Sequence, residues 1–294
     1  MPAGGLPFAS VDEVEKALRE AGYLPDRGLA TGIHLALGMR RPLLLEGEPG
    51  VGKTDVAKRL AGVLGLDLIR LQCYEGIDAA QAIYDWDYSR QLLHARLTAE
   101  TGGPGRVGTA DLYGPEFLLE RPLLRAVRTG GGCLLLIDEL DRADDEFEAF
   151  LLEILSEHAV TIPEIGTVCS AEPPAIVITS NRTRELHDAL KRRCVYHWIE
   201  FPTVERETEV VRIRVPEADD RLARSIAETV ARLRELDLAK RPGIAETVDW
   251  ARALTMIGAR ELNPELADAT VGVVIKGRED LGTVRQALGE IVGG

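Results

Sequence analysis

The segment from Gly47 to Thr54 has the residue types and spacing of a phosphate-binding loop. It reads G-x-x-x-x-G-K-T, in which glycines let backbone N–H groups approach an anion, the lysine reaches the terminal phosphates and the hydroxyl ligates Mg²⁺. The alternative is a glycine-rich turn between a strand and a helix, which does not require the Lys-Thr pair. The residues expected to bind the nucleotide are Gly47, Glu48, Pro49, Gly50, Val51, Gly52, Lys53, Thr54 and Asp55.

Two carboxylates follow an apolar run that has the character of a central parallel strand. The run covers residues 133–137, and Asp138 and Glu139 come directly after it. Ligands of α/β sheets bind at the carboxyl ends of the strands, so we expect both side chains at the edge that carries the loop. The alternative is that they cap the next helix, for which three later residues are better placed: Asp141, Asp144 and Asp145.

Polar and basic residues follow a further apolar run, residues 175–179. Asn181 either holds a water molecule at this edge or is a residue of the turn. Beyond it lies the basic triplet Lys191, Arg192 and Arg193. An arginine that reaches a neighbouring subunit's nucleotide stabilises charge in the transition state, whereas the alternative is a solvated basic turn.

Together these residue types fit ATP hydrolysis with Mg²⁺. Lys53 would neutralise charge on the β and γ phosphates, while Thr54 and Asp138 would hold the metal. Glu139 would accept a proton from the attacking water or orient it. Asn181 would fix that water or contact the γ phosphate, and Arg192 or Arg193 would complete the site.

The elements that must position these residues follow from the spacing of apolar positions. Strands are predicted over five apolar runs, at 42–46, 66–73, 133–137, 175–179 and 194–201. A helix over 54–64 between the first two makes a βαβ crossover, which implies a parallel sheet. Helices are also predicted over 11–21, 28–39, 89–100, 116–128 and 145–158, with a small hairpin over 160–169.

Two segments differ in character from this core. Residues 74–114 begin with an aromatic cluster and allow two interpretations, packing on the core or a surface that engages a partner. The cluster consists of Tyr74, Tyr84, Trp86 and Tyr88. After Pro202 the pattern is helical, and one helix has apolar residues at regular spacing: Leu222, Ile226, Val230, Leu233 and Leu236. A separate helical domain is therefore predicted from about Val204.

Composition restricts the class of protein. With 45% hydrophobic and 28% charged residues the chain is an ordinary globular one, and its net charge of −13 argues against broad affinity for nucleic-acid phosphates. The four cysteines are scattered without a C-x-x-C pair, so neither a zinc site nor a disulfide framework is indicated. The start lacks a signal peptide pattern and no apolar run is long enough to span a membrane, which predicts a cytoplasmic protein.

At this point the chain resembles the AAA+ ATPases, and among them the MoxR family, most closely its CoxD-like branch. The resemblance covers about residues 29–254 and depends on several ordered motifs. These are the Walker A loop 47–54, the Walker B run 134–143, the segment 150–155 with 160–162, a sensor 1 match at 179–181 and an arginine-finger match at 189–194.

The resemblance implies a P-loop three-layer αβα core with a parallel five-stranded sheet of order 5-1-4-3-2 and a small all-helical lid. The implied domains are an N-terminal helical segment (1–28), the nucleotide-binding domain (29–203) and the lid (204–294). It also implies ATP and Mg²⁺ as ligands and a hexameric ring. One departure concerns sensor 2: the stretch 241–247 has no arginine at the matching step, and Arg241 lies a few residues earlier.

The leading functional hypothesis is an ATP-driven, chaperone-like remodelling or maturation factor, possibly for a metalloenzyme together with a von Willebrand A-domain partner, as the resemblance implies. Alternatives are a nucleic-acid-directed motor or loader, against which the acidity argues, and a nucleotide-dependent scaffold that hydrolyses little ATP. A small-molecule kinase fits worst, since Asp138 and Glu139 serve water activation.

Overall fold

A computed structural model of the chain describes residues 7–100 and 112–293, so residues 101–111 of the 74–114 segment lie outside the described residues. The chain divides into two units. The sheet unit contains the residues up to Ser10, Thr31–Leu45 and Leu60–His197. The helical unit contains Val11–Ala30, Glu46–Arg59 and Trp198–Gly294.

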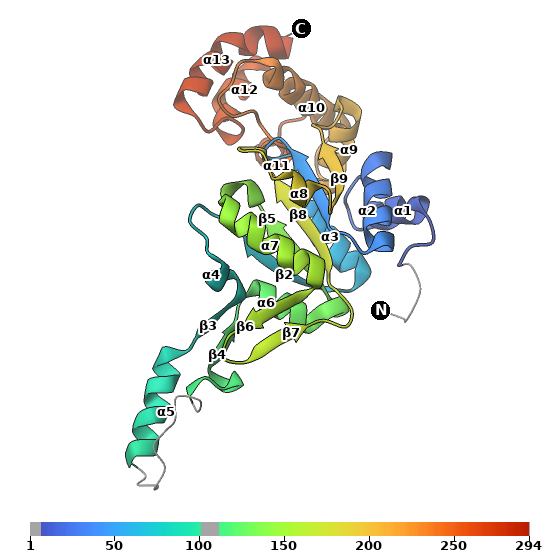
Figure 1. Cartoon of the computed structure of the whole chain (residues 1–294). Helices are drawn as coiled ribbons and strands as arrows, with labels where there is room; N and C mark the ends of the chain where they lie inside the picture. Colours follow the sequence, from blue (N-terminus) through green and yellow to red (C-terminus); the bar gives the residue numbers. More distant parts are fainter. Residues whose placement is uncertain (1–6, 101–111, 294) are drawn as a thin grey trace. The chain divides into compact units, whose positions relative to one another are not determined.

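Helices and strands alternate through the first two thirds of the chain, and helices follow (Figure 1). The strands are β1 (Leu43–Gly47), β2 (Asp67–Gln72), β3 (Tyr84–Trp86), β4 (Leu118–Glu120), β5 (Cys133–Asp138), β6 (Ala159–Ile162), β7 (Gly166–Cys169), β8 (Ala175–Ser180) and β9 (Val195–Ile199). The helices up to β9 are α1 (Val11–Glu20), α2 (Arg27–Met39), α3 (Lys53–Leu64), α4 (Ala79–Ile83), α5 (Tyr88–Glu100), α6 (Pro122–Thr129), α7 (Asp145–Glu157) and α8 (Asp188–Lys191). The later helices are α9 (Val204–Arg214), α10 (Asp220–Glu235), α11 (Ile244–Met256), α12 (Pro264–Thr270) and α13 (Arg278–Gly293).

Five strands form the main sheet, in the order β2-β5-β8-β1-β9. Numbered along the chain, these are strands 2-3-4-1-5, so the predicted parallel sheet of order 5-1-4-3-2 is confirmed. The crossovers are helical, as parallel strands require. The predicted hairpin is also present, since β6 pairs antiparallel with β7.

Strand β5 occupies an interior position in the sheet and is buried along its whole length. It pairs in parallel with β2 on one side, where Leu136 lies opposite Arg70, and with β8 on the other, where Leu136 lies opposite Val177. An uninterrupted apolar sequence is what such a strand needs, because both faces of the sheet are covered. The register brings the carboxyl ends of β2 and β5 together, with Gln72 opposite Asp138.

The predicted helix over 116–128 is wrong in its first half. Residues Pro115–Phe117 form a 3₁₀ turn and Leu118–Glu120 form β4, which pairs with β3 so that Leu118 lies opposite Trp86. The helix α6 begins only at Pro122, because proline has no N–H group and is tolerated in the first turn of a helix but not in its interior. Tertiary pairing with β3 therefore decides the conformation of this stretch.

The aromatic residues of the 74–114 segment divide into two groups. Trp86 is buried and contacts Tyr84 and Tyr113 edge to face, with ring centroids 5.9 and 5.0 Å apart. Such pairs belong to a packed core. Tyr74 and Tyr88, by contrast, are exposed. The packing interpretation therefore holds for the first group and not for the second.

Helix α5 extends beyond the two-stranded β3–β4 sheet (Figure 1). Its Gln91 side chain is buried and donates to the carbonyl oxygen of Leu112 at 2.6 Å. On another side of the helix Leu92, Leu93 and Leu97 are 56, 57 and 53% exposed. Single exposed apolar residues are normal on a protein surface, but three large exposed leucines on one short helix form a group that needs an explanation.

The helical unit has its own hydrophobic core, to which the predicted apolar stripe of α10 contributes. A buried ion pair joins α10 to α9: the Arg234 guanidinium donates to both Glu207 carboxylate oxygens at 2.5 and 2.7 Å. Thr247 of α11 donates to the same carboxylate at 2.6 Å. Arg234 also donates to the carbonyl oxygen of Pro242 at 2.8 Å, so this network holds the segment before α11.

Two further expectations concern cysteines and membrane spans. Cys73, Cys133 and Cys194 are buried free thiols and Cys169 is an exposed one, which agrees with the absence of a disulfide pattern. Over the described residues, no helix combines the length and the apolar character that crossing a membrane requires.

Candidate functional site

The loop after β1 adopts a conformation that only glycines tolerate. Gly50 and Gly52 have φ values of +84° and +95°, in the left-handed region that L side chains rarely adopt. A Cβ atom on Gly47 would lie 2.3 Å from the carbonyl oxygen of Ile199, where there is no room for it. The three glycines are therefore required by the shape of the loop, as its predicted sequence pattern implies.

Lys53, the first residue of α3, is buried beneath this loop. Its Nζ donates to the carbonyl oxygens of Gly47 at 2.6 Å and Glu48 at 2.8 Å. These bonds fold the ammonium group back over the loop, at the end of α3 where the helix macrodipole is positive. The Lys53 ammonium group and the amino end of α3 both attract negative charge, so together they make an anion-binding site.

The other residues of the predicted nucleotide-binding set differ in exposure. Glu48, Pro49 and Gly50 are exposed, Val51 is buried and Thr54 is partly buried in the first turn of α3. The Asp55 carboxylate accepts from Arg59 Nε at 3.3 Å and from Arg214 Nη2 at 2.5 Å. Its side chain is thus engaged within the helical unit, which leaves its backbone as the part able to contact a nucleotide.

The start of α11 packs directly on the loop, at the place where a sensor 2 arginine is missing from the sequence. The N–H of Ile244 donates to the carbonyl oxygen of Gly50 at 2.9 Å. A Cβ atom on Gly243 would lie 2.6 Å from the Cα of Gly50, so no larger residue fits there. Arg241 is exposed. Where the sensor 2 arginine is missing, the start of α11 therefore contacts the loop through its backbone.

In the sheet unit, Asp138 ends β5 and is 1% exposed. Its Oδ1 accepts from the Thr179 hydroxyl at 2.6 Å. Its Oδ2 accepts from Arg70 Nε at 2.9 Å and from Arg70 Nη2 at 2.6 Å. A buried carboxylate is stable only when it is paired and hydrogen-bonded, and these two residues supply that pairing.

Glu139 turns away from the strand that Asp138 ends. Its φ of +55° is left-handed, which is uncommon for a residue with a side chain and is concentrated at functional sites. Its N–H donates to the Thr179 hydroxyl at 2.9 Å. Its carboxylate is 35% exposed and lies 3.5 Å from the Arg142 guanidinium. The two acidic residues therefore have different environments, one buried and fixed and one reaching solvent.

Asn181 follows β8 and is held by Asp141. Its N–H donates to Asp141 Oδ1 at 3.0 Å, and the N–H and hydroxyl of Thr183 donate to Oδ2 at 2.9 and 2.7 Å. Asp141 is thus not a helix cap. The residue that caps α7 is Asp144, whose carboxylate accepts from the N–H of Phe147 at 2.9 Å. The structure fixes the backbone of Asn181 and leaves its side chain partly exposed.

The arginines of the basic triplet are not equivalent. Arg193 donates to the Ser156 hydroxyl at 3.0 Å and to the Ala189 carbonyl oxygen at 2.9 Å. Arg192 is exposed, and within the described part of the chain its side chain makes no hydrogen bond or ion pair. Of the two arginines, Arg192 is therefore the one whose guanidinium group is not bonded to another described residue of the chain.

Cys73 lies beside the acidic residues at the end of β2. Burial first, and then the nearby negative charges with Asp138 the largest of them, together raise the pKa of its thiol to about 12. The thiol is therefore protonated at neutral pH. Since the thiolate is the nucleophile and the metal ligand, Cys73 is a packing residue.

Arg70 and Thr179 are the contacts of Asp138 that sequence reasoning missed as functional residues. Thr179 was noted only as the start of the sensor 1 match. A charged residue within the otherwise apolar centre of β2 is the signal that identifies Arg70 in retrospect, because Arg70 and Gln72 share the strand face on which Asp138 lies.

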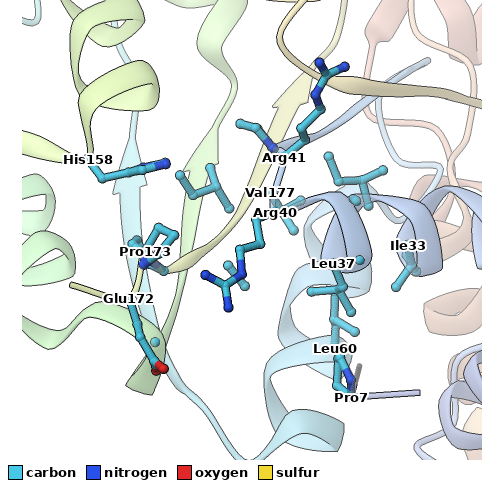
Figure 2. Close-up of a pocket in the computed structure, with 18 residues that line it drawn as sticks. Pro7, Ile33, Leu37, Arg40, Arg41, Leu60, His158, Glu172, Pro173 and Val177 are labelled. Carbon is cyan, nitrogen blue, oxygen red and sulfur yellow. The ribbon is translucent and has the colours of Figure 1, made fainter. Parts of the chain in front are cut away.

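A cavity of about 320 Å³ lies in the sheet unit at the amino ends of β1 and β8 (Figure 2). Arg40, Arg41, His158 and Glu172 are among its lining residues. In Figure 2 the Arg40 side chain lies between Glu172 and Leu37, whereas Arg41 points away from them. Asp138 is the last residue of β5 and Asn181 follows β8, so both lie at the carboxyl ends of their strands. The cavity lies at the amino ends and is therefore a different site.

The comparisons with known proteins concern the family and the fold. The family model AAA domain (dynein-related subfamily) matches residues 42–194, which is more than half of the chain. Protein NorQ of Paracoccus denitrificans (strain Pd 1222) is 28% identical over 64% of this chain and 63% of its own length. Protein CbbQ of Hydrogenophilus thermoluteolus is 27% identical over 68% of both chains. A ClpA homolog protein of Fuscovulum blasticum is 28% identical over 58% of this chain, which spans only a fifth of that relative's length.

The solved structures show the same fold at low sequence identity. The Thermotoga maritima RuvB Holliday junction branch migration motor has a TM-score of 0.50 and 19% identity, covering 98% of this chain and 81% of that one. This likeness concerns the fold alone. The match to an AAA domain implies nucleotide hydrolysis.

The matched range, residues 42–194, spans the loop after β1, the end of β5 and the end of β8. NorQ, CbbQ and NirQ are MoxR-family proteins, whereas the CoxD-like branch is not distinguished from the rest of that family. The chain therefore belongs to the AAA domain (dynein-related subfamily) family.

Proposed function

We propose that this protein hydrolyses ATP to ADP and phosphate with Mg²⁺ and uses the reaction to remodel a protein partner. The observation that carries the proposal is the loop around Lys53, whose ammonium group donates to the carbonyl oxygens of Gly47 and Glu48 at the start of α3. A loop of this shape positions the lysine to bind phosphates. A turn that only joins a strand to a helix does not need such a lysine.

The residues of the chain have separate roles in the proposed reaction. Lys53 binds the β and γ phosphates, and Thr54 and Asp138 supply the oxygen ligands that suit Mg²⁺. Bound there, the metal would neutralise phosphate charge. Glu139 takes a proton from water as the water oxygen attacks the γ phosphorus, and the bond to the bridging oxygen breaks so that ADP leaves. Asn181 orients the water.

A hexameric ring is the assembly proposed for this reaction, with ATP bound where subunits meet. Arg192, an exposed arginine whose side chain makes no hydrogen bond or ion pair within the described residues, would then reach the nucleotide of the neighbouring subunit. The domains at 29–203 and 204–294, with the helical segment 1–28 before them, are proposed as the nucleotide-binding domain, the lid and an N-terminal segment.

A protein partner is proposed because the relatives resemble chaperone-like activators and because α5 offers a surface for one. Leu92, Leu93 and Leu97 are exposed residues of α5, a helix that extends beyond the β3–β4 sheet (Figure 1). Whether the partner is a metalloenzyme, a von Willebrand A-domain protein or both is decided by its identification.

The test is capture of the partner by the Glu139→Gln variant loaded with ATP. We expect ATP-dependent capture that falls at least about tenfold when Leu92 and Leu97 are both replaced by Ser, since a few buried apolar anchors carry most of the energy of an interface. The control replaces Leu35 and Met39, which are equally exposed apolar residues of α2. Equal losses in both double variants, or capture without ATP, would contradict this assignment of α5.

A further inference from the structure

Arg70 is hydrogen-bonded to the carboxylate of Asp138, which is the proposed Mg²⁺ ligand. Both its Nε and its Nη2 donate to the same oxygen of Asp138, at 2.9 and 2.6 Å. A carboxylate oxygen has two lone pairs, so these two bonds use the acceptor capacity of Oδ2. The Thr179 hydroxyl takes one position on the other oxygen, at 2.6 Å.

The charges of the two residues explain why the pair forms. Asp138 is almost completely buried, and an ionised carboxylate in that position is costly without a positive partner. Arg70 supplies the charge from β2, the neighbouring strand, and its side chain remains 46% exposed. The arginine therefore neutralises the acid without being buried itself.

Arg70 also has a second partner to which it can turn. Its Nη2 contacts the side-chain oxygen of Gln72, two residues further along the same face of β2. Arg70 makes this contact at the same time as its bonds to Asp138, so the contact can be kept when Asp138 is released. Solvent then replaces the Asp138 contact at low cost, because a half-exposed guanidinium keeps much of its hydration. A fully buried arginine would have no such alternative.

We propose that Arg70 is a positioning residue that holds the Asp138 carboxylate in the absence of Mg²⁺ and competes with Mg²⁺ for it. The inference rests on the proposed ATPase function, since it concerns the residue assigned there to the metal. Loading the site with metal and nucleotide moves Arg70 off Oδ2 toward Gln72. The arginine thus makes the acid ready for the metal and sets the Mg²⁺ concentration at which the site fills.

The test measures how nucleotide binding depends on Mg²⁺, using a fluorescent ADP analogue over a series of Mg²⁺ concentrations. In Arg70→Gln the midpoint of the Mg²⁺ titration is expected to fall roughly tenfold, because a unit positive charge near a dication is removed along with the competing donors. Arg70→Lys keeps the charge and gives fewer donors, so its midpoint should fall less. A residue that only stabilised the fold would shift the midpoint upward when replaced.

The control is Arg121→Gln, which removes an arginine of similar exposure (47%) from an ion pair with Asp85 at 3.1 Å. Its Mg²⁺ midpoint is expected to equal that of the wild type. Without nucleotide and Mg²⁺, Arg70→Gln should unfold at a lower temperature than Arg121→Gln, because buried Asp138 loses its partner.

Three outcomes separate the two proposals. A midpoint in Arg70→Gln that is unchanged or higher, in a protein whose wild type binds the analogue with Mg²⁺, overturns the role of Arg70 and leaves the ATPase standing. A wild type that binds no nucleotide with Mg²⁺ overturns both. If Arg70→Gln does not fold, the Mg²⁺ titration of Arg70→Lys is the test instead. A midpoint at or above that of the wild type would then overturn the proposal that Arg70 competes with Mg²⁺ for Asp138.

Discussion

Replacing Glu139 with Gln should lower ATP turnover at least about 100-fold while ATP still binds. General bases contribute 10²–10⁴-fold to rates, and the amide of Gln cannot accept the proton of the attacking water. Binding is retained because Lys53 and the glycine loop, which contact the phosphates in the proposal, are unchanged. Phosphate release measures the first quantity, and titration with a fluorescent ATP analogue measures the second.

The control for this variant is Glu153→Gln on α7, an exposed acid of the same unit. It should leave both turnover and affinity at the wild-type values. If Glu139→Gln retains turnover within tenfold of the wild type, Glu139 is not the base. Loss of binding together with turnover would instead indicate that the left-handed turn at Glu139 is needed for the shape of the site.

Replacing Arg192 with Ala should lower turnover by roughly 10³-fold, the lower end of what an arginine finger contributes. Arg193→Ala should have a much smaller effect, because the Arg193 side chain is already bonded to Ser156 and Ala189 of its own chain. Nucleotide affinity should be close to that of the wild type in both variants. This contrast follows from the structure, since the sequence alone leaves the two arginines equivalent.

Mixing two inactive variants tests whether Arg192 acts across a subunit boundary. Arg192→Ala subunits retain Lys53, and Lys53→Ala subunits retain Arg192, so mixed rings contain some interfaces with both residues intact. Turnover should therefore reappear on mixing. Mixtures that stay inactive would contradict action in trans, and a greater loss in Arg193→Ala than in Arg192→Ala would reverse the assignment.

Much of the fold is predictable because its signals are local. The run 133–137 is apolar, as a strand needs when both faces of its sheet are covered, and that sequence identifies a central strand. The G-x-x-x-x-G-K-T pattern identifies the loop because Gly50 and Gly52 need positive φ values. Strand order followed from the family resemblance and was confirmed.

The parts that sequence reasoning missed depend on contacts between distant residues. Leu118 is in a strand rather than a helix because it pairs with Trp86. Arg70 contacts Asp138 only because β2 and β5 are neighbours in register. The place of Gly243 against Gly50 depends on how the start of α11 packs on the loop. In each case the partner is far away in the sequence, so composition and spacing do not identify the contact, even where the residue type is unusual for its place, as with Arg70 in β2.

The central claim is that this chain hydrolyses ATP through the Lys53 loop, and it is tested most directly by phosphate release from ATP. The account predicts release by the wild type that requires Mg²⁺ and that disappears in Lys53→Ala, along with binding of a fluorescent ATP analogue. Gly282→Ala, at a position with open space around it on α13, should release phosphate at the wild-type rate. Phosphate release by Lys53→Ala at the wild-type rate, or none by the wild type with ATP and Mg²⁺, would contradict the account.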